Sequence, residues 1–176
     1  MTKGTSWVLF LFLIPGISFA QYHPVENESA VQFTIKNFGF DVGGSFSGLD
    51  GEIRFNPDSL SNARFQVSIN AASINTGNNL RDGHLKDEDY LSVKAYPHIR
   101  FVSESVRPFR RGNYLIEGKL TIKNKTKEIS FPFTAASSGK GYLFTGSFKI
   151  NRKDFDIGGS STISDNLSVN LKVLAK

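Results

Sequence analysis

The chain has 176 residues, a formal net charge of +5 and no cysteine. Without cysteine, disulfide bonds, thiol chemistry and cysteine-ligated metals are excluded, so the fold depends on packing. The modest positive charge does not make nucleic acid an expected partner. An ordinary solvated basic surface explains this charge most simply, and a transient contact with anionic lipid head groups at a membrane surface is the alternative.

The first twenty residues have the layout of a secretory signal peptide. Lys3 precedes an uncharged apolar run over residues 7–14, and a small-residue pattern ends at Ala20. The run is shorter than the roughly 20 residues that a membrane-spanning helix needs. We therefore predict that residues 1–20 are a signal peptide, that residues 21–176 form one domain, and that the protein is secreted to the periplasm.

From residue 31 onward, apolar residues recur at every second position, which is typical of strands with one apolar and one polar face. Short turns separate the strands and indicate antiparallel pairing. The sequence therefore predicts an all-β fold, and long strands favour an eight-stranded barrel over a sandwich. The eight expected strands lie at about residues 31–35, 53–55, 63–71, 99–101, 114–122, 129–135, 142–150 and 167–173.

Three features qualify this strand pattern. Pro132 interrupts the run at 129–135, so a gap, edge or bulge is expected there because proline cannot donate to a ladder. The glycine-rich segments 41–48 and 156–161 resemble each other and are interpreted as barrel corners. Neither has the lysine and spacing of a phosphate-binding loop.

Phenylalanine dominates the faces that are expected to point inward, and two glycines share those faces. Gly118 and Gly146 would either widen the interior or permit a close approach of the backbone. Periodicity alone leaves two alternatives: a filled core, or a cavity for one slender ligand. The residues expected to line such a cavity are Phe33, Phe65, Phe101, Phe131, Phe133, Phe144, Gly146 and Phe148.

The most charged stretch, "NNLRDGHLKDEDYL" over residues 78–91, lies in the long connection before the strand at 99. Its apolar residues follow a helical spacing, so we predict one short helix near residues 80–93, lying over one mouth of the barrel. Arg81, Asp82, His84 and Arg152 are then candidates for contacts at the mouth or with a ligand head group.

Two interpretations of these charged residues compete. In an enzyme, His84 would be a general base oriented by Asp82 or Asp154, with Arg81 or Arg152 holding an anion. In a binding protein, Arg81 and Asp82 would only form an ion pair and a helix cap. We favour the structural role and predict no enzymatic activity. The three histidines lack metal-ligand spacing, so no metal site is expected.

The chain also resembles the YceI-like family in several segments. The most specific is "INTGNNLRDGHLKDEDYLSVKAYPHIRF", and "GGSFSGLDGEIRF", "GKLTIKNKTKEI" and "INRKDF" add to it. The residues that match the family pattern in the first segment are Thr76, Arg81, Asp82, His84, Leu85, Tyr96, Pro97 and Phe101. Two residues depart from the pattern: Asn37 stands where many members have a histidine that would contact a polar head group, and Asp156 stands where a glycine is usual.

This resemblance implies a lipocalin-like secreted barrel that encloses a polyisoprenoid lipid. The expected ligand is an isoprenoid or quinone-like lipid, with no other cofactor, held for transport, storage or stress protection. A few buried isoprene units would offset the cost of association, at roughly 0.8 kcal/mol per methylene. An extracytoplasmic stress or scaffold protein that binds no lipid remains the alternative outside enzymes.

Overall fold

The computed structural model describes residues 20–110, 112–159 and 162–176. The predicted signal peptide therefore lies outside the described residues, apart from Ala20. The described chain forms one antiparallel sheet whose strand order is β1-β4-β5-β6-β7-β8-β9-β10-β2-β3. Its strands are β1 (Gln21–Tyr22), β2 (Ala30–Asn37), β3 (Phe40–Phe46), β4 (Asp50–Arg54), β5 (Arg64–Asn70), β6 (His98–Arg110), β7 (Asn113–Ile122), β8 (Lys125–Ser138), β9 (Gly141–Asn151) and β10 (Ile163–Ala175).

The all-β antiparallel prediction is confirmed, whereas the described residues form ten strands rather than eight. The two additional strands are β1 and β3. Helices are short: one α-helix, α1 (Asn79–Lys86), and the 3-10 helices η1 (Glu26–Glu28), η2 (Leu60–Asn62), η3 (Ala71–Ser73) and η4 (Arg152–Phe155). Among the described residues, no helix has the length and apolar character needed to cross a membrane.

Strand β3 corrects the interpretation of the glycine-rich segment 41–48 as a corner. Gly44 pairs with Phe33 across the β2–β3 ladder. A side chain at Gly44 would collide with the Phe33 ring. The glycine is therefore there to accommodate an aromatic ring, and the chain stays extended. In the second glycine-rich segment, Asp156 does adopt a left-handed φ of +52°, which explains why glycine suits that position.

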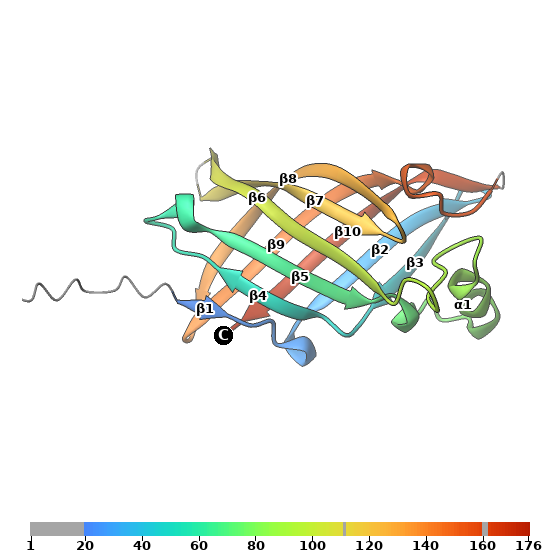
Figure 1. Cartoon of the computed structure of the whole chain (residues 1–176), viewed down its shortest axis with the longest axis horizontal. Coiled ribbons are helices and arrows are strands. Elements are labelled where there is room, and N and C mark those ends of the chain that lie inside the picture. The colour runs from blue at the N-terminus through green and yellow to red at the C-terminus, as the bar shows by residue number, and fades with distance from the viewer. Residues whose placement is uncertain (1–19, 111, 160–161) are drawn as a thin grey trace, which may run out of the picture.

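The sheet curls until its edges meet, as Figure 1 shows. At one edge, His23 and Lys176 exchange backbone hydrogen bonds of 2.8 and 3.0 Å. The Val25 amide also donates to the Leu174 carbonyl at 2.7 Å. These bonds join the segment after β1 to the end of β10. Because β1 itself pairs with β4, β1 and this segment together connect β4 to β10 at one end of the molecule.

The other edge closes without a regular ladder. Ser45 in β3 exchanges backbone hydrogen bonds of 2.9 and 3.0 Å with Asn75, in the connection that follows β5. The Asn70 amide donates to the Ser47 carbonyl at 3.1 Å. The sheet is thus barrel-like, with one seam made by irregular backbone bonds.

A gap in the wall lies between β8 and β9. Their ladder runs only from the Phe133–Gly146 pair to the Ser138–Gly141 pair, so Pro132 marks where it stops. The gap expected at Pro132 is therefore confirmed. Helix η4 contacts both strands there, and its Phe155 is 1% exposed. This ring seals the wall where the ladder does not.

Strand β1 and the C-terminus lie at the same end of the barrel (Figure 1). Aromatic rings fill that end. Phe55, which directly follows β4, is 3% exposed and packs edge to face against five rings at centroid distances of 5.1 to 6.2 Å. Burial raises the pKa of Tyr142 above its usual value. We call this cluster the aromatic plug; it consists of Phe55, Phe65, Tyr114, Phe133, Tyr142 and Phe144.

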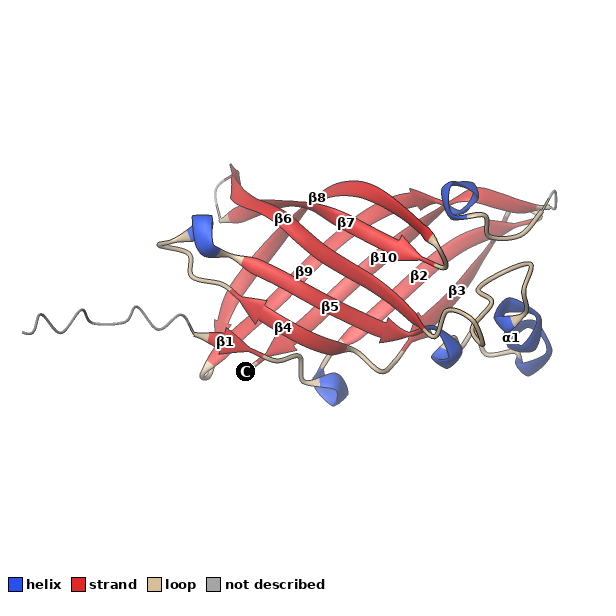
Figure 2. Cartoon of the chain, viewed as in Figure 1, coloured by secondary structure: helices blue, strands red, loops and turns tan. Residues whose placement is uncertain are grey.

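Helix α1 lies at the opposite end, close after Asn75, which pairs with Ser45 near the end of β3 (Figure 2). The prediction of one short helix in this connection is confirmed, although α1 ends at Lys86 and residues 87–96 are turns. Leu80 is one of the apolar residues at helical spacing that would face the barrel if α1 covered it with its apolar side, but it is 73% exposed. Leu85 and Leu91 do face the interior.

Candidate ligand-binding site

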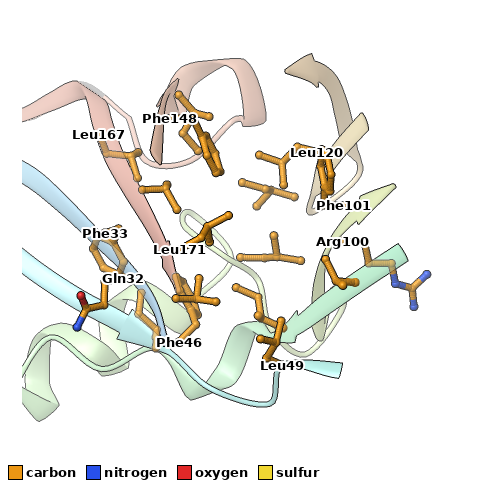
Figure 3. Close-up of a pocket in the computed structure, with 18 of the residues that line it drawn as sticks. Gln32, Phe33, Phe46, Leu49, Arg100, Phe101, Leu120, Phe148, Leu167 and Leu171 are labelled. Atoms are coloured by element: carbon orange, nitrogen blue, oxygen red, sulfur yellow. The ribbon is translucent and has the colours of Figure 1, made fainter. Parts of the chain in front are cut away.

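A cavity of about 280 Å³ occupies the half of the barrel between the aromatic plug and α1. Its lining atoms are almost all apolar, and the cavity is partly open. Figure 3 shows the side chains of Phe101, Leu120 and Leu171 directed into this space, whereas the polar ends of Gln32 and Arg100 point away from it. Alternation along the strands produces this sorting, because neighbouring residues face opposite sides of the sheet.

The structure places all eight predicted lining residues on the wall of this cavity. They have two different positions. Phe65, Phe133 and Phe144 belong to the aromatic plug and form the floor. Phe131 and Phe148 stack with centroids 4.6 Å apart on the side wall.

The two glycines of the apolar faces do not widen the interior. A Cβ atom at Gly146 would lie 3.3 Å from the Phe133 Cβ and 3.4 Å from the Phe131 Cδ2. At Gly118 it would lie 2.5 Å from the Val102 carbonyl oxygen, 2.7 Å from the Ser103 Cα and 2.8 Å from the tip of the Phe101 ring. Gly146 therefore permits close packing of rings and Gly118 permits the close approach of the β6 backbone, so the alternative that they create empty space is wrong.

Arg81 and Asp82 meet at Thr76, just before α1. The Thr76 amide donates to the Asp82 carboxylate at 2.9 Å, and the Thr76 hydroxyl donates to the same oxygen at 2.5 Å. Arg81 Nε donates to the Thr76 hydroxyl at 2.7 Å, and Arg81 Nη2 donates to the Thr76 carbonyl at 2.8 Å. The two charged residues thus act together through Thr76, without a direct ion pair, and hold the start of α1.

The helix cap is a different residue from the one expected. The side chain of Asn78 accepts from the Arg81 amide at 3.0 Å, so Asn78 is the N-cap. Arg81 lines the cavity and is half-buried, whereas Asp82 is buried behind it and does not line the cavity. Of this pair, only Arg81 is positioned to meet a ligand.

Arg152 also lines the cavity, and its side chain is 5% exposed. Its guanidinium donates to the carbonyls of Ile157 at 2.7 Å and Ser164 at 3.1 Å. It also pairs with Asp165 at 2.9 Å. These bonds hold the corner between η4 and β10, so Arg152 shapes the mouth mainly through the backbone.

His84 does not approach the cavity. It is exposed on α1, and the described part of the chain shows no hydrogen bond between its ring and Asp82 or Asp154. The described residues also contain no group of three or more metal-ligating side chains. The general-base arrangement that we considered from the sequence is therefore not assembled in this structure.

Much of the cavity wall is aliphatic, whereas the lining residues predicted from the sequence were seven phenylalanines and one glycine. The aliphatic residues follow the same alternation as the rings and could have been found by extending each face along its strand. The end near α1 also receives residues from outside the predicted strands. The main residues missed are Ile35, Phe46, Ile69, Ile74, Leu85, Tyr90, Leu91, Ile122, Ile163, Leu167, Val169 and Leu171.

A model of the YceI-like domain matches residues 22–175. The chain belongs to the YceI-like family. A UPF0312 protein of Shewanella denitrificans is 31% identical over 136 residues, covering 73% of this chain and 71% of that protein. A UPF0312 protein of Photorhabdus laumondii is 32% identical over 147 residues, covering 77% of this chain and 76% of its own length.

Solved structures share the fold. BcnA of Burkholderia cenocepacia matches with a TM-score of 0.81 and 26% identity, over 85% of this chain and 98% of that one. A polyisoprenoid-binding domain from Saccharophagus degradans, implicated in plant cell wall breakdown, matches with a TM-score of 0.71 over 90% of this chain and 99% of its own. The sequences of the two chains are 14% identical, so this likeness is evidence for the fold alone.

Proposed function

We propose that this protein is an exported, periplasmic binding protein that encloses the apolar chain of an isoprenoid or quinone-like lipid. The observation that carries the proposal is the cavity of about 280 Å³ with an almost wholly apolar lining. Binding there needs no catalytic group, since burial of apolar surface supplies the driving force. Family membership and the likeness to a polyisoprenoid-binding domain support the same ligand class.

The arrangement of the cavity suits a ligand with one polar end. Its floor is the aromatic plug, which has no charged member, so the apolar tail would point there. Polar side chains line the other end, among them Asn37, Thr76 and Arg81. A polar head group would therefore sit near Arg81 and a tail would run between Phe131, Phe148 and the β10 leucines.

Holding a lipid in this way would serve its transport, its storage or its protection during stress. The test is mass spectrometry of an organic extract of the purified protein, followed by titration of the delipidated protein with a fluorescent isoprenoid. We expect a bound isoprenoid-type lipid and saturable binding of the probe. An extract without lipid, together with no probe binding, would favour a scaffold protein that binds no lipid.

Export is tested by the intact mass of the secreted protein, which we expect to begin at Gln21. A chain that keeps residues 7–14 and stays with the membrane would contradict the signal peptide.

A further inference from the structure

The β2–β3 hairpin tip carries two of the three most exposed large apolar side chains of the described residues. Phe38 is 72% exposed and Phe40 is 77% exposed. Exposed phenylalanines scattered singly are ordinary on protein surfaces. Here two of them lie two residues apart at one protruding tip, and neither lines the cavity or joins the core clusters.

The backbone of this turn makes Phe38 an unusual choice. Phe38 and Gly39 form the two-residue loop of the hairpin, with φ angles of +49° and +83°. Such turns favour asparagine or aspartate followed by glycine, because a bulky side chain at positive φ is sterically unfavourable. A phenylalanine with most of its surface in water gains little from packing there. The strained position and the exposure together indicate that the ring contacts something outside the chain.

The tip lies at the mouth of the cavity. Ile35, Asn37 and Val42, which flank it on β2 and β3, all line the cavity. The Phe38 amide donates to the Thr162 carbonyl at 3.3 Å, which fixes the tip beside the corner that Arg152 holds. Helix α1, which carries the exposed Leu80, lies at the same end of the molecule (Figure 1).

We propose that this end of the molecule docks on a lipid bilayer, with Phe38 and Phe40 inserted among the lipids and Leu80 at the contact's edge. We call these three residues the docking tip. Exposed phenylalanine and leucine side chains can bury themselves at the boundary between head groups and acyl chains. Removal of Lys3 with the predicted signal peptide lowers the formal net charge from +5 to +4, which still adds a mild attraction to an anionic surface. Docking at the mouth would let an apolar ligand pass between the bilayer and the cavity without crossing water.

This inference rests on the proposed function only for that last step, the passage of a ligand. The membrane contact itself stands on the hairpin. The two claims therefore need separate measurements: vesicle binding without any added ligand, and probe binding without any vesicles.

The first test uses the secreted protein and vesicles of phosphatidylethanolamine and phosphatidylglycerol. The variant Phe38→Asn/Phe40→Thr removes both rings, and asparagine fits the positive φ better than phenylalanine does. The hairpin should therefore keep or gain stability, so lost docking cannot come from misfolding. We expect the parent to float with the vesicles and the variant's partition coefficient to fall about tenfold or more.

The matched control is Phe109→Ser at the other end of the barrel. Phe109 is 43% exposed and lies under the Arg110 guanidinium, 5.3 Å from its ring centroid. It does not line the cavity. We expect this variant to float as the parent does. Equal flotation of the hairpin variant, no flotation of the parent, or a loss confined to Phe109→Ser would overturn the docking proposal.

A second test reports the orientation directly. The only tryptophan of the chain is Trp7, in the predicted signal peptide, so the secreted protein provides a tryptophan-free background. In that background, Phe40→Trp should shift its emission to the blue with vesicles and be quenched by brominated lipid. Phe109→Trp should show neither effect. The reverse pattern would place the other end on the membrane and overturn the proposal.

Two further measurements separate the outcomes. In sedimentation experiments, a parent dimer that the hairpin variant converts to a monomer would show that the tip binds a second copy and would overturn docking. In buffer without vesicles, the parent and the variant should bind the fluorescent isoprenoid equally. If the parent does not bind that probe, the proposed function fails, and flotation still decides whether the tip docks.

Discussion

The two halves of this barrel-like sheet are built from the same alternating strands, yet one is filled and the other contains a cavity. The filled half has Phe55, a ring that directly follows β4 and packs edge to face against five others. The half near α1 has a smaller group of side-wall rings, in which Phe131 contacts Phe101 and Phe148. A single ring at the centre of a cluster therefore decides whether such a barrel is packed solid.

The walls of the two halves differ in the same way. The β8–β9 ladder is confined to the filled half, from the Phe133–Gly146 pair to the Ser138–Gly141 pair. In the cavity half, Phe155 of η4 closes the wall with side-chain packing. A wall held by packing can adjust to a ligand more easily than a continuous ladder, so we expect the cavity half to be the adaptable one.

The largest expected effect tests the centre of the plug. Phe55→Ala should lower the free energy of unfolding by about 3 to 5 kcal/mol, because it removes a ring that five neighbours surround. Denaturant unfolding measures this cost. Phe148→Ala is the matched change in the cavity half and should cost less, since that ring already borders open space. Equal costs would contradict the division into a filled and an open half.

A second comparison inserts the same ring into each half. Val106 is buried in the filled half and does not line the cavity, whereas Val169 lines it. Val106→Phe should overpack its surroundings and cost about 1 to 3 kcal/mol. Val169→Phe should leave the melting temperature close to that of the delipidated parent and abolish probe binding. Melting curves and titrations of both variants supply the measurements.

The result that would break this comparison is a loss of stability in both variants. It would mean that the space beside Val169 is packed in solution, and binding would then need another site. Gly146→Leu is a poorer choice for this purpose. Its Cβ would already lie 3.3 Å from the Phe133 Cβ, so overpacking is expected there whether or not a cavity exists.

Eight of the ten strands could be predicted from alternation, which covers several periods in the longer ones and a single period at residues 53–55. Strand β1 has two residues, too few to show any period, and its place depends on bonds to β10. Strand β3 was misinterpreted because glycine is rare in strands, while the reason for Gly44 is the Phe33 ring on the neighbouring strand. Local pattern cannot reveal a partner that is only adjacent in the folded sheet.

The candidate site was predictable to the same degree. The inward faces of Phe33, Phe101 and Phe148 follow from alternation, and all three line the cavity. The division between plug and cavity does not follow, since it depends on where Phe55 meets rings from other strands. The helical connection was located by the spacing of its apolar residues. The partner of Asp82 could not be found in this way, because Thr76 precedes the helix, and Asp82 was therefore assigned to a cap or an ion pair.

A third prediction concerns the cover of the open half. Asp82→Ala would leave the Thr76 amide and hydroxyl without their carboxylate acceptor, at a cost of about 1 to 3 kcal/mol. Asn78→Ala removes only the helix cap and should cost about 1 kcal/mol. Hydrogen exchange of the α1 amides should rise in both variants and rise more with Asp82→Ala. Unchanged exchange would show that this network does not hold the helix.

The smallest expected effect tests the catalytic alternative. His84 is exposed on α1 and does not line the cavity. Asp82, on the same helix, is buried and does not line the cavity either. An exposed residue of this kind typically changes stability by no more than about 0.5 kcal/mol when replaced. His84→Ala should therefore leave both the melting temperature and the isoprenoid titration unchanged. Arg81→Ala, in contrast, should weaken the binding of a probe with an anionic head group. It should not change the binding of a probe without such a head group. If the protein turned over a substrate and His84→Ala abolished that activity without changing stability, this interpretation would be reversed. His84 would then be a general base at the helix surface, and the cavity would be the pocket of an enzyme.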